Sequence, residues 1–350
     1  MIFTHRFLQP FGRAFYLSCI LAWLFAPAAC MPFTPPETEE FTTSATGEGL
    51  FVVNQGNFMY ANASLSYYNP QTKDIENEIF VRANGINLGD VAQSMVLYKE
   101  TAYVVVNNSG VVFAIDPKTF TLKGMLTGLV SPRNIHFVNE DKAYITDLYA
   151  ESIAVADPIT LQITGVIPTP GHASTEAITA WEHLVFVSCW SYDNTLLIIN
   201  TKTDRIVDSL KVGSHPNQLL TDAAGHIWCT TQEGIYRIDP RDKKSLLKIP
   251  ASPNAFNTYI ALNGTQDSLY YIANDLYVMH IEDVYPPSLP LIHGENRLFY
   301  GLAVDPTSSH IYLADALNYV EPGHILRYNP QGELLDDFIT GINPSAFCFK

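Results

Sequence analysis

The sequence predicts an all-β protein: a seven-bladed β-propeller with four antiparallel strands per blade. A short phrase, in which apolar residues lead into Asn, Asp or Glu and usually Pro or Thr, recurs at intervals of 39–47 residues. Periods in this range are typical of repeat architectures. Two further observations support the propeller: each interval contains several short apolar runs, and the two ends of the repeat region match complementary strands of one unit. The markers of the phrase are Asn69, Asp116, Asp157, Asn200, Asp239, Glu282 and Asn329.

Residues 1–29 are expected to be a signal peptide that is removed. Arg6 and Arg13 precede an apolar stretch from Ala14 to Phe25, which is too short to span a bilayer. Small residues then precede Cys30, an arrangement that resembles a bacterial lipobox. Cys30 is therefore expected to carry lipid, with simple secretion as the alternative.

Residues 30–48 are rich in proline, threonine and glutamate and have no apolar periodicity. Such a composition predicts an extended, flexible tether. A lipid on Cys30 together with this tether would hold a globular body at a membrane without crossing it.

Residues 49–350 are expected to form the propeller. Short runs rich in Val, Ile and Tyr, separated by turn residues, indicate strands, and no segment shows a sustained helical stripe. The four runs of the third unit are Asn134–Val138, Lys142–Thr146, Ser152–Ala156 and Gln162–Ile167.

The two ends of the propeller region complement each other. Gly49–Asn54 matches the second strand of other units, so the first unit has no first strand of its own. Asn343–Phe349 matches the first strand of other units. We therefore expect the C-terminal strand to pair into the first blade and close the ring, which leaves no open sheet edge.

The charge balance excludes some classes of partner. The net charge is −15, and removal of residues 1–29 takes away two arginines and no acidic residue. Nucleic acids and anionic lipids need clusters of Lys and Arg, which the sequence does not contain. The membrane is therefore expected as a partner through the lipid anchor only.

No catalytic residue, metal-ligand set or resident cofactor is assigned from the sequence. The motifs of serine hydrolases, P-loops, zinc proteases and dinucleotide-binding folds are absent, and no two histidines have metal-ligand spacing. We therefore expect a protein that is not an enzyme, although the fold itself does not decide this. Cys189, Cys229 and Cys348 are expected to be buried thiols, with one disulfide as the alternative.

Val207–Pro216 resembles the YVTN-type repeat of bacterial surface propellers. Longer strings resemble the BtuG-type surface lipoproteins of Gram-negative gut bacteria: Gly49–Phe58, Gly89–Met95, Cys189–Tyr192 and Pro344–Lys350. The resemblance implies a lipoprotein of the outer membrane that faces the cell exterior, captures a cobalamin-type corrinoid and delivers it to a TonB-dependent transporter. Two alternatives stay open: capture of an iron-siderophore complex, and a structural or adhesive role without a small ligand.

The loop after the second strand of each unit lies on the face opposite the marker turns. Its first residue is Asn or Asp in five units, and these residues are expected to form a polar crown at the mouth of the channel. The alternative is that they cap turns locally. They are Asn54, Asn107, Asp147, Asn274 and Asp315.

Two of these loops, Gln55–Ala63 and Ala316–Gly323, are longer than the rest and become neighbours when the ring closes. Aromatic rings interleaved with amides suit a large planar ligand that bears amide groups, as a corrinoid does. Packing between blades is the alternative for each ring. The candidate aromatic residues on this face are Phe58, Tyr60, Tyr149, Trp190, Tyr192 and Tyr319.

A ferric siderophore is often anionic and would need a cluster of basic residues. The candidates on this face are Arg82, Arg133 and Arg297, which are far apart in the sequence. Few basic residues among amide-rich loops favour a neutral or cationic ligand.

Overall fold

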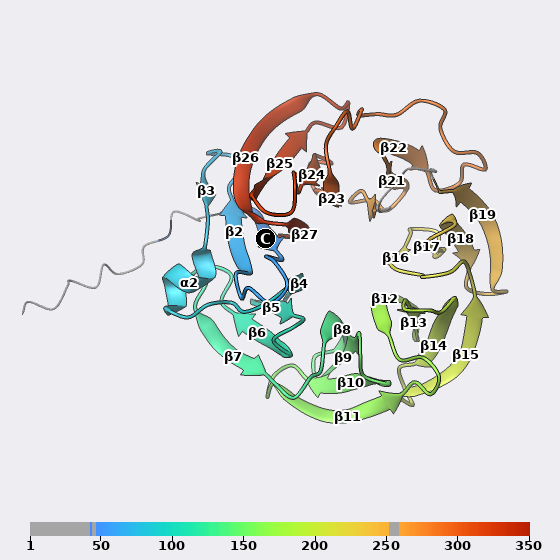
Figure 1. Ribbon diagram of the computed structural model, residues 1–350. Coiled ribbons are helices and arrows are strands. Elements are labelled where there is room, and N and C mark those ends of the chain that lie inside the picture. The colour runs from blue at the N-terminus through green and yellow to red at the C-terminus, as the bar shows by residue number, and fades with distance from the viewer. Residues whose placement is uncertain (1–42, 44–46, 252–258) are drawn as a thin grey trace, which may run out of the picture. The chain divides into compact units, whose positions relative to one another are not determined.

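The computed structural model describes residue 43, residues 47–251 and residues 259–350. Seven antiparallel sheets surround a central axis, and the innermost strands contact one another in ring order (Figure 1). The predicted signal peptide, Cys30 and most of the predicted tether lie outside the described residues. Within the described ranges, no helix is long and apolar enough to cross a bilayer.

Each sheet runs outward from the axis. The inner strands are β27 (Pro344–Phe349), β4 (Ala92–Tyr98), β8 (Pro132–Asn139), β12 (Thr175–Trp181), β16 (Leu219–Thr221), β20 (Ile260–Leu262) and β23 (Phe299–Val304). The second strands are β1 (Leu50–Asn54), β5 (Thr101–Val106), β9 (Lys142–Asp147), β13 (Leu184–Cys189), β17 (Ile227–Thr231), β21 (Ser268–Ala273) and β24 (Ile311–Asp315). The third strands are β2 (Ser64–Tyr68), β6 (Val111–Ile115), β10 (Ser152–Asp157), β14 (Thr195–Asn200), β18 (Gly234–Asp239), β22 (Asp275–His280) and β25 (Pro322–Tyr328). The outer strands are β3 (Ile75–Glu76), β7 (Leu122–Leu126), β11 (Gln162–Pro168), β15 (Arg205–Lys211), β19 (Lys244–Pro250) and β26 (Leu334–Ile342).

The predicted repeat is confirmed at the level of strands and turns. The four runs expected in the third unit fall within β8, β9, β10 and β11. The recurring phrase forms the turn that follows the third strand. In the third blade, Asp157 Oδ1 accepts the backbone N–H groups of Ile159 (2.8 Å) and Thr160 (3.2 Å). The marker residue is therefore an Asx-type turn cap.

The hydrophobic core lies between neighbouring blades. Middle strands such as β1, β6 and β17 are buried at every position, because both faces of a sheet pack on adjacent sheets. Outer strands such as β15 are mostly exposed instead, with only Ile206 and Leu210 of that strand partly buried. One cluster joins Val105 and Val112 of the second blade to Ile145 of the third.

The predicted ring closure is confirmed. β27 pairs antiparallel with β1, with Leu50 opposite Phe349 and Val52 opposite Phe347. Blue β2 and red β26 come together at this junction in Figure 1, and the two strands are in contact. Apolar side chains of the first and seventh blades form one buried cluster there.

Two departures from the four-strand plan were not expected. In the first blade, β3 has only two residues and is followed by a short helix, α2 (Ile79–Asn84). Phe80 of this helix is buried, and its ring lies 5.1 Å from that of Phe113. A helix of six residues is too short for the sequence to show a helical stripe.

The sixth sheet has three strands, β20, β21 and β22, in the part of the chain that the structure describes. An isolated bridge between Leu276 and Ile292 stands where the fourth strand is expected. Pro286, Pro287 and Pro290 lie in this stretch, and proline cannot donate to a strand ladder. This is also the unit with the degenerate marker, Glu282.

The three described cysteines, Cys189, Cys229 and Cys348, are buried free thiols. Burial raises the pKa of each.

Candidate ligand-binding site

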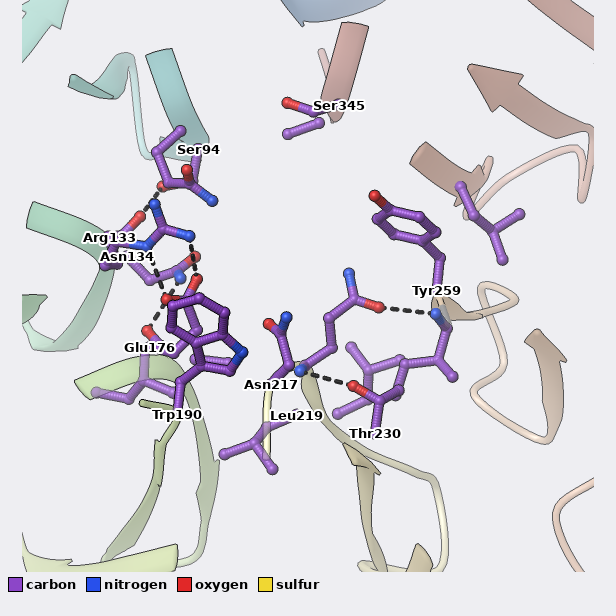
Figure 2. A pocket seen from close by; sticks show the side chains of 18 of the residues that line it. Ser94, Arg133, Asn134, Glu176, Trp190, Asn217, Leu219, Thr230, Tyr259 and Ser345 are labelled. Carbon is purple, nitrogen blue, oxygen red and sulfur yellow. Dashed lines mark hydrogen bonds and ion pairs between the residues drawn. The ribbon is translucent and has the colours of Figure 1, made fainter. Parts of the chain in front are cut away.

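The axis of the ring opens into a cavity of about 980 Å³. All seven inner strands contribute to its wall, together with residues of the loops at the end where the inner strands begin. This end also carries the loops after the second strands, so the cavity opens on the face that the sequence indicates. Figure 2 shows side chains from several blades converging on it.

β-Bulges aim polar side chains into the cavity. Five inner strands, β4, β8, β12, β23 and β27, shift register at their cavity end. A bulge leaves extra residues unpaired and redirects their side chains. The residues at these bulges are Gln93, Arg133, Asn134, Glu176, Ala177, Tyr300 and Ser345, and all of them line the cavity.

Buried hydroxyl groups on the second strands hold three of the inner strands in place. Thr146 Oγ1 accepts the N–H of Asn134 (3.0 Å) and donates to the carbonyl of Glu176 in the next blade (2.6 Å). Ser188 Oγ accepts the N–H of Ala177 (2.9 Å) in the same manner. Thr230 Oγ1 accepts the N–H of Gln218 (2.9 Å). The backbone at the cavity is therefore fixed without a ligand.

Side-chain amides dominate the polar part of the wall. Some of them are already engaged: Gln218 Oε1 accepts the N–H of Ile260 (2.8 Å), and Gln55 Oε1 accepts the hydroxyl of Tyr300 (3.0 Å). Burial raises the pKa of Tyr300, so its hydroxyl stays protonated and can donate. The amide residues of the wall are Gln55, Gln93, Asn134, Asn217, Gln218 and Gln232.

Two ionised side chains of the wall neutralise each other. Arg133 Nε and Nη2 each donate to a different carboxylate oxygen of Glu176, at 2.7 Å in both cases. The Glu176 side chain is only 4% exposed, and a bidentate pair of this kind is strong and geometrically specific. Apart from this pair, the wall carries no Lys, Arg, Asp or Glu among the described residues, so the cavity presents little net charge.

Several polar atoms of the wall have no hydrogen-bond partner among the described residues. They are Gln93 Oε1, His215 Nδ1 and Ser345 Oγ, each buried. Buried polar groups are normally paired, so unpaired ones in a cavity wall mark places for a ligand or ordered water. Two of the three lie on the bulges.

Aromatic rings form the third component of the wall. Trp190 follows β13 and lines the cavity, as predicted for this face, and its ring lies 6.4 Å from that of His215. Tyr259 and Tyr300 also line it, with their rings edge to face at 6.2 Å. Tyr319 packs on the outer side of this group, 5.4 Å from Tyr300.

The other predicted aromatic residues lie outside the cavity wall. Phe58, Tyr60 and Tyr149 are exposed at 63%, 76% and 72%. Tyr192 is 97% exposed and borders a second, smaller cavity. The two long loops do meet as expected, because Asn57 Nδ2 donates to the carbonyl of Tyr319 (2.6 Å).

The predicted polar crown is absent from the cavity wall. Asn274 is exposed, and the other four members are buried at strand ends: Asn54, Asn107, Asp147 and Asp315. Asp147 shows their local role, since its carboxylate accepts the N–H groups of Ser131 (2.8 Å) and Ala150 (3.0 Å). Such contacts are those of turn caps, and a direct part in ligand binding stays a prediction.

Most wall residues were missed because they stand at the start of the inner strands. A recurring signal marks them in three units: proline followed by polar residues immediately before an apolar run. The three copies are Pro132-Arg133-Asn134, Pro216-Asn217-Gln218 and Pro344-Ser345.

The structure also brings together a group of possible metal ligands that spacing along the sequence did not indicate. His172, Cys189 and Asp193 place one ligand atom each within 4.8 Å of the others.

A family model described as a domain of unknown function, DUF5074, matches residues 48–337. The chain belongs to the DUF5074 family. The match covers nearly all of the propeller, from two residues before β1 into β26. A comparison with curated proteins found no match.

Solved structures similar to this DUF5074 propeller share its fold at low identity. A quinonprotein alcohol dehydrogenase-like protein from Bacteroides thetaiotaomicron is 15% identical, with a TM-score of 0.69 over 87% of this chain and 79% of that one. A periplasmic gluconolactonase from Pseudomonas aeruginosa is 11% identical, with a TM-score of 0.66 over 87% and 99%. A functionally unknown protein from Desulfotomaculum acetoxidans is 12% identical, with a TM-score of 0.65 over 87% and 98%. At these identities the likeness concerns the fold alone.

Proposed function

We propose that this protein captures a corrinoid of the cobalamin type in the central cavity and delivers it to a TonB-dependent outer-membrane transporter. The observation that carries the proposal is the wall of the cavity, which among the described residues has six side-chain amides, four aromatic rings (Trp190, Tyr259, Tyr300 and Phe347) and a single, self-neutralised ion pair. A corrinoid is a large, flat macrocycle with amide side chains. Such a wall offers it both ring contact and hydrogen bonds.

The size of the cavity supports a large ligand. Its volume of about 980 Å³ is at the upper end of the range of roughly 300–1,000 Å³ that is usual for small-molecule sites. The unpaired acceptor Gln93 Oε1 and the hydroxyl of Ser345 supply polar contacts that a ligand amide can complete.

The electrostatics favour a corrinoid over an anionic iron-siderophore complex. Of the three arginines considered for an anion, only Arg133 lines the cavity, and it is bound to Glu176. Arg82 pairs with Glu76, and Arg297 pairs with Glu295. Capture of an anionic complex would require breaking the buried Arg133–Glu176 pair, which is costly.

Hand-over requires that the ligand stay accessible from one side. The cavity opens on the face that carries the long loops of the first and seventh blades, with exposed Phe58, Met59 and Tyr60. We infer that the transporter approaches this face. Lipid on Cys30 and the tether of residues 30–48 would allow that approach from the outer membrane.

Nothing in the described cavity favours catalysis. Its one carboxylate, Glu176, accepts hydrogen bonds from Arg133 on both oxygens, and its side chain is 4% exposed. A general base needs access to its substrate. The enzymatic names of some similar structures therefore do not lead to a proposed reaction here.

Equilibrium binding of cyanocobalamin tests the proposal. Trp190→Ala and Gln93→Ala are each expected to weaken binding by about 10-fold or more, since truncation of a residue central to an interface costs over 1 kcal/mol. The melting temperature should change little for Trp190→Ala, because Trp190 lies in a loop. The matched control is Tyr285→Ala. This residue is 82% exposed and lies in a marker turn, on the face of the propeller opposite the long loops. Absence of corrinoid binding by the unaltered protein would overturn the proposal.

A further inference from the structure

We propose that His172, Cys189 and Asp193 form a binding site for a divalent transition metal ion of the zinc class, beside the central cavity. The three ligand atoms, one nitrogen, one sulfur and one oxygen, all lie within 4.8 Å of one another. Zinc binds these three atom types at about 2.0–2.3 Å in tetrahedral sites, which places ligand atoms about 3.3–3.8 Å apart. Small side-chain rotations would bring the set to that spacing.

The fold holds the three residues from three directions. Cys189 is the last residue of β13 and is 1% exposed. His172 lies in the loop between β11 and β12, where its backbone N–H donates to the carbonyl of Thr169 (2.9 Å). Asp193 lies in the loop between β13 and β14. Because β13 pairs with both β12 and β14, the two loops meet above the end of β13.

Neighbouring groups orient the carboxylate. Asp193 Oδ1 accepts the N–H of Asn194 (2.7 Å) and the hydroxyl of Thr195 (2.6 Å). The other oxygen, Oδ2, is left for His172 Nδ1 at 2.5 Å. Partners of this kind fix metal-ligating side chains in known sites, where they contribute strongly to affinity.

The thiol distinguishes this cluster from ordinary histidine–carboxylate pairs. The described residues contain three other such pairs, His226–Asp222, His293–Asp275 and His324–Asp337. Within the described ranges, no cysteine completes any of these three pairs into a group of possible ligands. Burial raises the pKa of Cys189 to about 12, so the metal-free thiol is protonated and gives up its proton when an ion binds.

A second cavity gives access to the cluster. Its volume is about 530 Å³, and His172, Asp193 and Tyr192 are in its wall. His215 lines both this cavity and the central one, and its Nδ1 is buried without a hydrogen-bond partner among the described residues. Three protein ligands with an accessible fourth position describe an open metal site, in which water or an exchangeable ligand completes the coordination.

Titration with Co²⁺ as a spectroscopic probe tests the site. The full-length chain, without a histidine tag and without corrinoid, is stripped with a chelator and titrated. We expect one ion per chain and a thiolate-to-cobalt charge-transfer absorption in the near ultraviolet, which Zn²⁺ displaces. His172→Gln and Asp193→Asn should each weaken binding by about 10-fold or more.

Cys189→Ser should abolish the absorption, whereas the matched control Cys229→Ser, also a buried free cysteine, should retain it. If Cys189→Ser does not fold, the two loop variants still decide the outcome, because His172 and Asp193 are partly exposed. The proposal is overturned if saturating Co²⁺ gives no thiolate absorption, if the absorption survives in Cys189→Ser, or if both loop variants bind as the unaltered protein does.

Discussion

At the scale of single residues, interactions between sequence neighbours could be predicted and distant ones could not. Asp157 caps its own turn through residues two and three positions ahead, so the phrase is visible in the sequence. The Arg133–Glu176 pair joins residues 43 positions apart, and only the packing of two blades brings them together. For the same reason, Trp190 was the one residue predicted for a corrinoid that lies in the wall of the central cavity, and the bulge residues other than Arg133 were missed.

Asp336 provides a residue-scale prediction about acid stability. It accepts hydrogen bonds from Tyr68 (2.7 Å) and Arg327 (2.9 Å) and pairs with Lys73 (2.5 Å), which links the seventh blade to the first. Burial alone would raise the pKa of Asp336, but these partners outweigh it and hold the pKa below its usual value. The contribution of Asp336 is therefore present above about pH 4 and is lost as the pH falls through its folded-state pKa.

Asp336→Asn is expected to lower the free energy of unfolding at neutral pH by about 1–3 kcal/mol. It should also flatten the decline of stability below about pH 4, as measured by urea denaturation across pH. Asp337→Asn is the matched control, since Asp337 is 47% exposed and pairs only with His324 among the described contacts. An unchanged acid profile in Asp336→Asn would contradict the assignment.

At the scale of elements, the repeat predicted strands well wherever each strand obeys the common pattern. The exceptions are α2 and the missing fourth strand of the sixth sheet. In the first case, six helical residues replace most of an outer strand, and tertiary contacts of Phe80 outweigh local pattern. In the second, three prolines prevent a ladder from forming.

β27 gives an element-scale prediction. Deletion of residues 344–350 removes the inner strand of the first blade and leaves the inner edge of β1 unpaired. The loss is expected to exceed about 5 kcal/mol, comparable to the whole net stability of many domains. The variant should show no cooperative urea transition and should elute as an aggregate.

Deletion of Lys350 alone is the control, because that residue lies beyond β27. A monomeric deletion variant with a cooperative transition near that of the full chain would show that closure contributes little.

At the scale of the whole molecule, the number of blades and the closed ring followed from the count of repeats and from the two matching ends. The cavity did not, because its wall is made by inner strands from every blade. The molecule carries a net charge of −15, yet the charges of the cavity wall cancel. The net negative charge therefore lies outside the cavity wall that is proposed to bind the ligand.

This separation predicts how salt affects binding. The dissociation constant for cyanocobalamin should change by less than about 2-fold between about 0.05 and 0.5 M NaCl, because screening acts on exposed charges over about 4–14 Å. Isothermal titration calorimetry at several salt concentrations measures this. A steep dependence on salt would instead indicate that exposed charged groups of the protein take part in binding.

Ring closure also determines when the first blade can be completed. Leu50 and its partner Phe349 are separated by about 300 residues, so β27 emerges from the ribosome or an export channel long after β1. During that interval β1 offers an unsatisfied edge to which a strand of another molecule can add. The pairing that closes the finished ring therefore forms last, and the chain is most prone to aggregate before it forms. A chaperone that binds the incomplete chain would matter most before β27 is available.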